Sequence, residues 1–178
     1  MVLALLIASL LVTDVDARPA SPAAVRAPSL IVLKSKRELQ LLRGGTIVRT
    51  YHVALGLDPV TSKERQGDFA TPEGVYFICR KNPQSKFDRS LAISYPGPND
   101  AQRGLEEGLI SEQERNRIIE AWVLRTPPPA NTRLGGEICI HGKGSTYDWT
   151  DGCVALDYLD IEELYRAVPV GTPVEIRP

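Results

Sequence analysis

The 178-residue sequence predicts a mostly β domain with one helical insertion and one helix after Cys153. Three observations support this fold class. Short β-branched runs joined by tight turns open the domain, and such runs favour a meander of strands. Helix-start signals gather between residues 99 and 125, and a last helical pattern follows Cys153. The expected core is therefore a sheet to which helices are added.

The first strands are predicted from apolar and β-branched runs over residues 30–33, 38–42 and 46–55. A charged turn at residues 34–37 separates the first two strands. The glycine pair at residues 44–45 is a hairpin signal before the third. Because strands joined by tight turns pair with their neighbours, we expect an antiparallel sheet.

Two more strands are expected over residues 75–79 and 90–95. The first follows the turn sequence T-P-E-G at residues 71–74. The second is stopped by the prolines within residues 96–98. These strands extend the sheet and lead into the helical insertion.

The insertion, residues 99–125, is predicted to form two helices. Asn99 or Asp100 can cap the first, which ends near residue 107. Ser111 and Glu114 form a capping box for the second. Its apolar stripe consists of Ile118, Ile119, Trp122 and Val123. Two interpretations of the insertion stay open: a wall of a substrate groove, or an inert outer layer.

Residues 137–156 hold the side chains most suited to catalysis. Within them Ile138 and Ile140 alternate with Cys139 and His141, the period-2 pattern of a strand. A glycine-rich loop follows, and a tight turn of sequence T-D-G ends at Cys153. The loop is long enough to fold back, so we expect Cys153 to approach the imidazole of His141.

A thiol beside an imidazole has a clear chemical use. The imidazole of His141 can take the proton of Cys153, and the imidazolium can later protonate a leaving amine. Backbone N–H groups at the Gly152–Cys153 turn, to which Thr150 and Asp151 also belong, can hold a developing oxyanion. The group that orients the imidazole is the carbonyl of Gly142 or the carboxylate of Asp151.

After Cys153, Asp160 and Glu163 form a second capping box, which predicts a helix to residue 167. A closing strand is expected over residues 173–176. The domain is thus expected to span residues 29–177.

The first residues predict a secreted protein. Residues 1–17 are mostly apolar and are interpreted as a signal peptide, with a retained membrane anchor as the alternative. Residues 18–28, rich in proline and alanine, are interpreted as a linker. The expected localisation is therefore the periplasm or cell envelope. A net charge of −1 gives no reason to expect a nucleic-acid partner.

The chain has three cysteines, Cys79, Cys139 and Cys153. In an oxidising compartment an odd number leaves at least one free thiol. If Cys153 is the reactive thiol, Cys79 and Cys139 either pair or are separate small buried residues, and the sequence leaves both open.

Two motifs in this sequence resemble those of a known family. His141 and Gly142, followed by T-D-G-C at residues 150–153, resemble the signature of L,D-transpeptidase (YkuD-type) catalytic domains. The T-P-E-G turn is similar to a second motif of that family. The form D-W-T-D-G-C-V-A-L is similar to its YafK-like branch. The usual signature has His before the Gly-Cys pair and often Arg or Asn soon after the Cys, whereas this chain has Asp151 and Ala155.

The resemblance implies a fold and a set of residue roles. The fold is a β-sandwich or open barrel with a helical insertion. His141 would be the general base, Cys153 the nucleophile and Gly142 the carbonyl that orients the imidazole. Tyr95 and Trp149 are separate candidates for substrate binding; the alternative for Tyr95 is a strand-ending turn, and for Trp149 it is packing beneath the loop.

The resemblance also implies an activity. The reaction is cysteine-dependent transpeptidation of peptidoglycan stem peptides through a thioester, in cell-wall biosynthesis and remodelling. It needs no metal or organic cofactor, a monomer suffices, and carbapenems are candidate inhibitors. The branch contains both cross-linking enzymes and hydrolases, so the acyl acceptor stays open.

Two other function classes were weighed. A zinc site could use Cys139, His141, Cys153 and Asp151, although their spacing matches no common finger. A wall-binding domain without activity would not need both His141 and Cys153.

Overall fold

The computed structural model describes residues 27–178, and the expected signal peptide and most of the expected linker lie outside this range. The first strand begins at Pro28, so the last residue of the expected linker already belongs to the sheet. Within residues 27–178, no helix is both long and apolar enough to cross a membrane.

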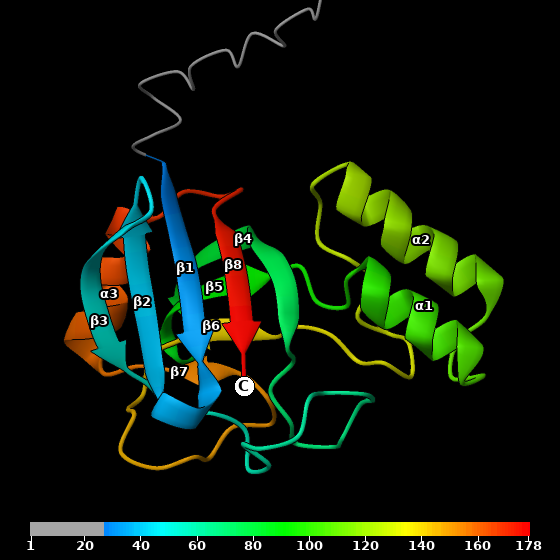
Figure 1. Ribbon diagram of the computed structural model, residues 1–178, viewed down its shortest axis with the longest axis horizontal. Coiled ribbons are helices and arrows are strands. Elements are labelled where there is room, and N and C mark those ends of the chain that lie inside the picture. The colour runs from blue at the N-terminus through cyan, green and yellow to red at the C-terminus, as the bar shows by residue number, and fades with distance from the viewer. Residues whose placement is uncertain (1–26) are drawn as a thin grey trace, which may run out of the picture.

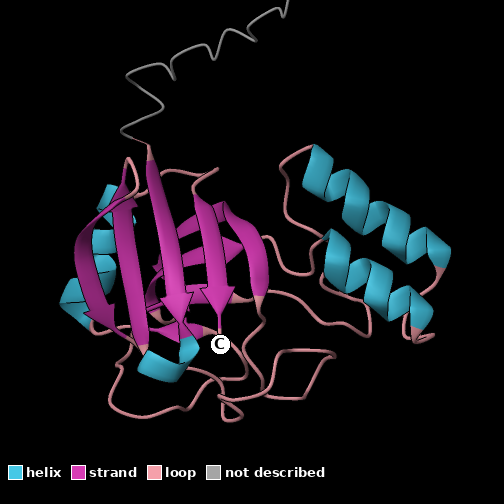
Figure 2. Ribbon diagram, viewed as in Figure 1, coloured by secondary structure: helices cyan, strands magenta, loops and turns pink. Residues whose placement is uncertain are grey.

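One curled sheet of eight strands forms the body of the domain (Figures 1 and 2). Its order is β3-β2-β1-β8-β4-β5-β6-β7. The strands are β1 (Pro28–Leu33), β2 (Glu38–Arg43), β3 (Thr46–His52), β4 (Gly74–Ser85), β5 (Asp88–Ile93), β6 (Cys139–His141), β7 (Val154–Ala155) and β8 (Pro173–Arg177). The mostly β fold class is therefore confirmed.

The expectation of a purely antiparallel sheet is wrong at two places. β1 pairs with β8 in parallel, and β6 pairs with β7 in parallel. Neither pair is joined by a hairpin, which is the connection that forces antiparallel pairing. β6 and β7 are linked by the long loop 142–153, which carries the chain back to the start of a parallel neighbour.

The helical insertion lies to one side of the sheet as a pair of helices (Figure 1). These are α1 (Pro98–Glu106) and α2 (Glu112–Val123). Gly97, not Asn99 or Asp100, is the N-cap of α1, and the Asp100 carboxylate accepts the Gly97 N–H at 2.8 Å. The capping box of Ser111 and Glu114 is confirmed.

The insertion has a small core of its own, made of Ala101, Ile110, Ile118 and Leu134. Val123, expected in the apolar stripe of α2, is instead 72% exposed. Trp122 reaches the sheet, where its ring packs edge-on against Phe77 with centroids 5.2 Å apart. The insertion is thus anchored to the domain by a few apolar contacts.

The helix after Cys153 is α3 (Tyr158–Ala167), and it begins earlier than expected. Asp157 is its N-cap residue, so the expected start at Asp160 is wrong. The Asp157 carboxylate does not cap the helix with its side chain; it accepts the backbone N–H of Ser145 at 3.0 Å. This contact ties the start of α3 to the loop between β6 and β7.

The main core lies between the curled sheet and α3. Its buried side chains include Leu30, Val32, Tyr51, Ile78, Ile93, Ile140, Leu164 and Ile176. They come from the first and last strands alike, so the whole domain shares this core.

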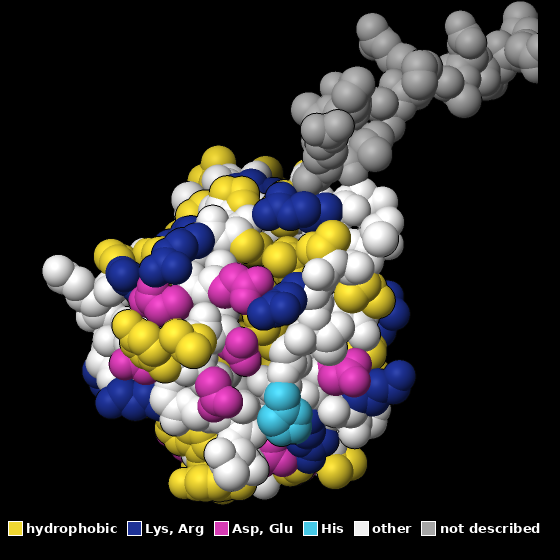
Figure 3. All heavy atoms as spheres, turned by 90° about the vertical axis from the view of Figure 1, so that its left-hand side faces the viewer, with side chains coloured by type: hydrophobic (Ala, Val, Ile, Leu, Met, Phe, Trp, Pro, Cys, Tyr) yellow, Lys and Arg dark blue, Asp and Glu magenta, His cyan; other side chains and the backbone are white. Residues whose placement is uncertain are grey.

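Figure 3 shows the face at the left of Figure 1, where acidic and basic side chains are interspersed.

Candidate active site

The parallel pairing of β6 and β7 brings the thiol to the imidazole. Ile140 pairs with Val154 and His141 with Ala155, and Cys153 immediately precedes this pair of strands. Cys153 and His141 line one cavity of about 250 Å³. The two side chains, twelve positions apart in sequence, therefore open into the same space.

The imidazole of His141 is held in one orientation. Its Nδ1 lies 2.7 Å from the carbonyl oxygen of Gly142, so Nδ1–H donates there and Nε2 is left for the thiol. The ring is 2% exposed. Phe87 stacks on it with centroids 4.5 Å apart, and Trp149 packs edge-on at 5.6 Å. The Gly142 carbonyl thus occupies the position for which Asp151 was the other candidate.

The environment of Cys153 favours the thiolate. A side-chain hydrogen bond from Cys139, and then the hydrogen bond and charge of His141, hold the pKa of the Cys153 thiol well below its usual range. The backbone N–H of Cys139 also donates to Cys153 Sγ at 3.3 Å. Burial opposes these effects, because a low-dielectric environment penalises the charged form.

The T-D-G turn is held by hydrogen bonds of its own. The hydroxyl of Thr150 donates to the Cys153 carbonyl at 2.7 Å and accepts the N–H of Gly152 at 3.1 Å. The Gly152 N–H is therefore engaged, and the expectation that it faces an oxyanion is corrected. The N–H of Cys153 itself becomes the better candidate. Asp151 is exposed at the rim of the cavity.

A second cavity of about 270 Å³ adjoins the first. The two cavities share Gly136, Glu137, Ile138 and Asp151 as lining residues. Together they make one groove, with Cys153 in the first cavity. The far wall of the second cavity includes Lys63, Gln66, Gly67 and Phe69.

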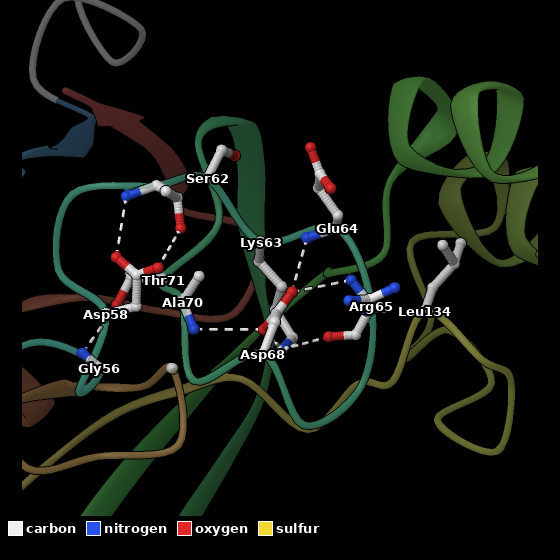
Figure 4. Close-up of polar contacts among 12 residues, drawn as sticks. Gly56, Asp58, Ser62, Lys63, Glu64, Arg65, Asp68, Ala70, Thr71 and Leu134 are labelled. Atoms are coloured by element: carbon white, nitrogen blue, oxygen red, sulfur yellow. Dashed lines mark hydrogen bonds and ion pairs between the residues drawn. The ribbon is translucent and has the colours of Figure 1, made fainter. Parts of the chain in front are cut away.

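That wall belongs to a loop held by buried charges (Figure 4). The Asp68 carboxylate accepts from Lys63 Nζ at 2.7 Å and from the N–H groups of Glu64 and Arg65, each at 2.8 Å. Lys63 is only 4% exposed. These contacts fix the loop without a helix or strand, so the groove has a defined wall.

The same loop packs directly on the catalytic turn. The N–H of Leu57 donates to the Thr150 carbonyl at 3.0 Å. A Cβ on Gly152, whose φ is 123°, would lie 2.5 Å from the carbonyl oxygen of Ala70. The turn therefore needs glycine both for its backbone angle and for the close approach of the loop.

The two expected substrate-binding residues lie in different places. Tyr95 is fully buried, and its hydroxyl donates to the Leu134 carbonyl at 3.1 Å. It cannot line the groove, so that expectation is wrong. Trp149 is half-buried and lines the cavity of Cys153, while its indole N–H donates to the Gly144 carbonyl at 3.1 Å.

The structure also shows contacts in the site that the sequence did not predict. Phe87 lies on the hairpin between β4 and β5, and no local motif marks it as a neighbour of His141. Cys139 is expected from the sequence as a zinc ligand, a partner of Cys79 or a packed residue, but its backbone N–H contacts Cys153 instead. This contact follows from the parallel register of β6 and β7, which the sequence does not show.

The three cysteines are free thiols. Cys79 lies on β4 and Cys139 on β6, with β5 between them. Two strand spacings are about 9.6 Å, more than the 7 Å that a disulfide tolerates between Cα atoms. The alternative in which Cys79 and Cys139 pair is therefore wrong for this structure.

In the described part of the chain, no group of three or more His, Cys, Asp and Glu side chains could hold a metal ion. Cys139, His141, Cys153 and Asp151 thus do not form the tetrahedral ligand set that a zinc site requires.

Solved structures with a similar fold come from several bacteria. The cell-shape-determining protein Pgp2 of Campylobacter jejuni matches with a TM-score of 0.56 and 23% identity, covering 85% of this chain and 47% of that one. Bd1075 of Bdellovibrio bacteriovorus matches at 0.56 and 21%, covering 89% and 50%. An L,D-transpeptidase of Xylanimonas cellulosilytica matches at 0.52 and 17%, covering 85% and 60%. At these identities the likeness shows the fold.

Sequence comparisons point to the same family. A 53-residue segment is 40% identical to YafK of Escherichia coli strain K12, which is 29% of this chain and 20% of that protein. The chain spans about half the length of the matched structures and a fifth of YafK. The family model for the L,D-transpeptidase catalytic domain (YkuD) matches residues 27–176. The chain therefore belongs to the L,D-transpeptidase catalytic domain family, as its two motifs suggested.

Proposed function

We propose that the protein is a cysteine-dependent L,D-transpeptidase that acts on peptidoglycan stem peptides in the cell envelope. The observation that supports this most is that Cys153 and His141 line the same cavity, where His141 helps to lower the pKa of the Cys153 thiol, in a chain that belongs to this enzyme family. The reacting groups and both cavities come from one chain, so a monomer suffices.

In the first step the Cys153 thiolate attacks the carbonyl carbon of the meso-diamino acid, in the amide bond that joins this residue to the terminal D-residue of a donor stem. A C–S bond forms, and the carbonyl oxygen takes the negative charge beside the N–H of Cys153. His141, as imidazolium, protonates the amine of the terminal D-residue, and the C–N bond breaks. A thioester remains on Cys153.

In the second step an amine of another stem attacks the thioester. Neutral His141 takes a proton from this amine, the new amide forms, and the Cys153 thiolate is released. The groove offers room in the cavity of Cys153, about 250 Å³, and in the adjoining cavity of about 270 Å³. One cavity can hold the donor stem while the other receives the acceptor.

Hydrolysis is the second candidate, in which water resolves the same thioester. Ala155, which stands where the family often has Arg or Asn, is fully buried and offers no polar group to an acceptor. The structure of the site therefore supports the acyl-enzyme step for both outcomes, and the acceptor decides between them.

The test is incubation with purified muropeptides, followed by mass analysis. Cross-linked dimers with loss of the terminal D-residue are the expected products, whereas shortened monomers alone would identify a hydrolase. Cys153→Ala should abolish both, and Cys79→Ala, a buried thiol outside the groove, is the matched control. Unchanged muropeptides with the intact protein would overturn the proposal.

A carbapenem gives an independent test of the nucleophile. Its strained lactam carbonyl can acylate a thiolate, so the protein mass should rise by one drug molecule. The adduct should lie on the tryptic peptide 144–166 and be absent from Cys153→Ala. An adduct that persists in this variant would contradict the assignment of Cys153.

A further inference from the structure

Cys139 and Cys153 face each other across the two parallel strands. Ile140 pairs with Val154, so one residue earlier the same register sets Cys139 opposite Cys153. Neighbouring strands lie about 4.8 Å apart, and a disulfide accepts Cα separations of about 4.4–6.8 Å. The backbone spacing at this point therefore suits a disulfide without movement of the sheet.

The contacts of the two sulfur atoms agree with this register. The N–H of Cys139 donates to Cys153 Sγ at 3.3 Å. Both thiols also approach one oxygen, the Glu137 carbonyl, at 3.4 Å from Cys139 Sγ and 3.9 Å from Cys153 Sγ. The two side chains thus point into the same small space at the edge of the groove.

The two thiols differ in how readily they react. The pKa of the Cys153 thiol is lowered, which favours its thiolate. The pKa of the Cys139 thiol is raised, first by the hydrogen bond between the two side chains and then by burial. An oxidant that enters the groove therefore meets the Cys153 thiolate first. Cys79 takes no part, because its buried thiol donates a hydrogen bond to the Ala92 carbonyl on β5, the strand between β4 and β6.

We propose that Cys139 is a resolving thiol, which closes a reversible disulfide with Cys153 when a hydroperoxide oxidises the site. The Cys153 thiolate attacks the peroxide, the O–O bond breaks, and a sulfenic acid and hydroxide form. The sulfur of Cys139 then attacks the sulfenic sulfur, the S–O bond breaks, and water leaves. In sum, two thiols and one hydrogen peroxide give one disulfide and two waters.

The oxidation of Cys153 prepares the attack by Cys139. The hydrogen bond between Cys139 and Cys153, and then burial, raise the pKa of the Cys139 thiol, and the charge of Cys153 adds to this. A neutral sulfenic acid on Cys153 removes that charge, so Cys139 loses its proton more readily when it attacks. The disulfide would protect Cys153 from irreversible oxidation to the sulfinic and sulfonic acids. The form with the Cys139–Cys153 disulfide would be inactive, because its Cys153 has no free thiolate. Only this consequence rests on the proposed function.

Trypsin separates the three cysteines, which makes the linkage directly readable. Cys79 falls in peptide 66–80, Cys139 in peptide 134–143 and Cys153 in peptide 144–166. The experiment treats the reduced full protein with hydrogen peroxide, blocks remaining thiols and digests without reductant. The expected product joins peptides 134–143 and 144–166, with the loss of two hydrogen atoms, and dithiothreitol returns both free peptides.

Two variants make the result decisive. Cys79→Ala should give the same linked peptide as the wild type. Cys139→Ser and Cys139→Ala should instead leave Cys153 with two or three added oxygen atoms that dithiothreitol does not remove. Sulfinic acid on Cys153 of the wild type without the linked peptide, or a link to Cys79, would overturn the proposal. Because the readout is peptide mass, this outcome is independent of whether the enzyme transfers or hydrolyses.

Discussion

The ring of Phe87 lies nearly parallel to the imidazole of His141, with 20° between their planes and 4.5 Å between their centroids. The backbone reinforces the contact, because the N–H of Gly142 donates to the Phe87 carbonyl at 2.9 Å. The hairpin between β4 and β5 therefore supports the imidazole from behind while the Gly142 carbonyl fixes its Nδ1.

Removing this support should slow the reaction of Cys153. A stacked aromatic pair is worth about 0.5–1.5 kcal/mol, so Phe87→Leu should lower the rate of Cys153 alkylation by iodoacetamide about 2–10-fold. Phe87→Tyr, which keeps the ring, is the matched control and should react at nearly the wild-type rate. Equal rates for all three proteins would show that the stack does not position the imidazole.

The pH dependence of alkylation should reveal the thiolate. Hydrogen bonding from Cys139, and then His141, lowers the pKa of Cys153, so its rate–pH midpoint should lie well below the ordinary thiol value of about 8.5. His141→Gln should move this midpoint upward. Labelling is followed on peptide 144–166, and the protein in denaturant gives the reference midpoint.

The same shift has a consequence for stability. Folding lowers the pKa, so the ionised thiol contributes stability that is fully present above the unfolded pKa and is lost as pH falls through the folded one. Cys153→Ser should therefore show less loss of stability than the wild type as pH falls across this window. If the alkylation midpoint of native Cys153 lay near that of the denatured protein, both the lowered pKa and its effect on stability would be contradicted.

The contribution of Asp100 to the stability of the domain should be larger in weak acid than at neutral pH. Burial raises the pKa of this carboxyl, so the folded state holds its proton more tightly than the unfolded chain does. Its contribution is thus present below about pH 3.9 and is lost as pH rises through the folded pKa. Asp100→Asn removes this loss, so urea unfolding should show the stability of the variant gaining on that of the wild type as pH rises.

A second variant separates charge from hydrogen bonding at this position. One oxygen of Asp100 accepts from the Tyr76 hydroxyl at 3.1 Å and from the Gly97 N–H at 2.8 Å. The amide oxygen of Asp100→Asn can accept both, whereas Asp100→Ala leaves the Gly97 N–H without this partner and the Tyr76 hydroxyl with only the Glu73 carbonyl, at 3.1 Å. The alanine variant should lose about 1–3 kcal/mol at every pH. Identical behaviour of the two variants would sink this interpretation.

Lys34 should be one of the most sensitive charged residues. It is 1% exposed, and its Nζ donates to Glu73 and the Thr61 carbonyl at 2.7 Å each. Since loss of one partner leaves buried polar groups unpaired, Lys34→Met should lower the free energy of unfolding by about 3 kcal/mol. The control is Arg49→Met, because Arg49 pairs with Glu163 at the surface and should cost about 0–1 kcal/mol.

Gly152→Ala should damage the site more than its backbone angle alone would. The added Cβ would meet the Ala70 carbonyl at 2.5 Å, so loop and turn must move apart. Gly45 also has a positive φ, 79°, but its Cβ would meet nothing within 4 Å. Gly45→Ala should therefore cost only about 1–2 kcal/mol, with Cys153 alkylation unchanged. Similar losses in both variants, measured by urea unfolding, would contradict a tight contact at Gly152.

The sequence predicted those parts of the fold that local pattern controls. The period-2 alternation around His141, the capping box of Ser111 and the glycine pair before β3 all depend on residues close together in the chain. The spacing of His141 and Cys153 was likewise readable, since a glycine-rich loop can close only over a limited distance.

The remaining features depend on partners far away in the chain. The direction of β8 is set by its neighbours, not by a turn of its own. Lys34 looked like part of a solvated turn, yet it is buried because residues 60–73 fold over it. Tyr95 stands at the end of a predicted strand, and only its contacts with Tyr76 and Leu134 show that it belongs to the core.

The position of β8 has a consequence for how the domain folds. This strand follows all the other described strands in sequence, yet it lies between β1 and β4 and bonds to both. The strands β3-β2-β1 and β4-β5-β6-β7 therefore join into one continuous sheet only when β8 is in place between them. Loss of residues 173–177 should thus disturb the whole sheet, because β1 and β4 would each lose a hydrogen-bonded neighbour.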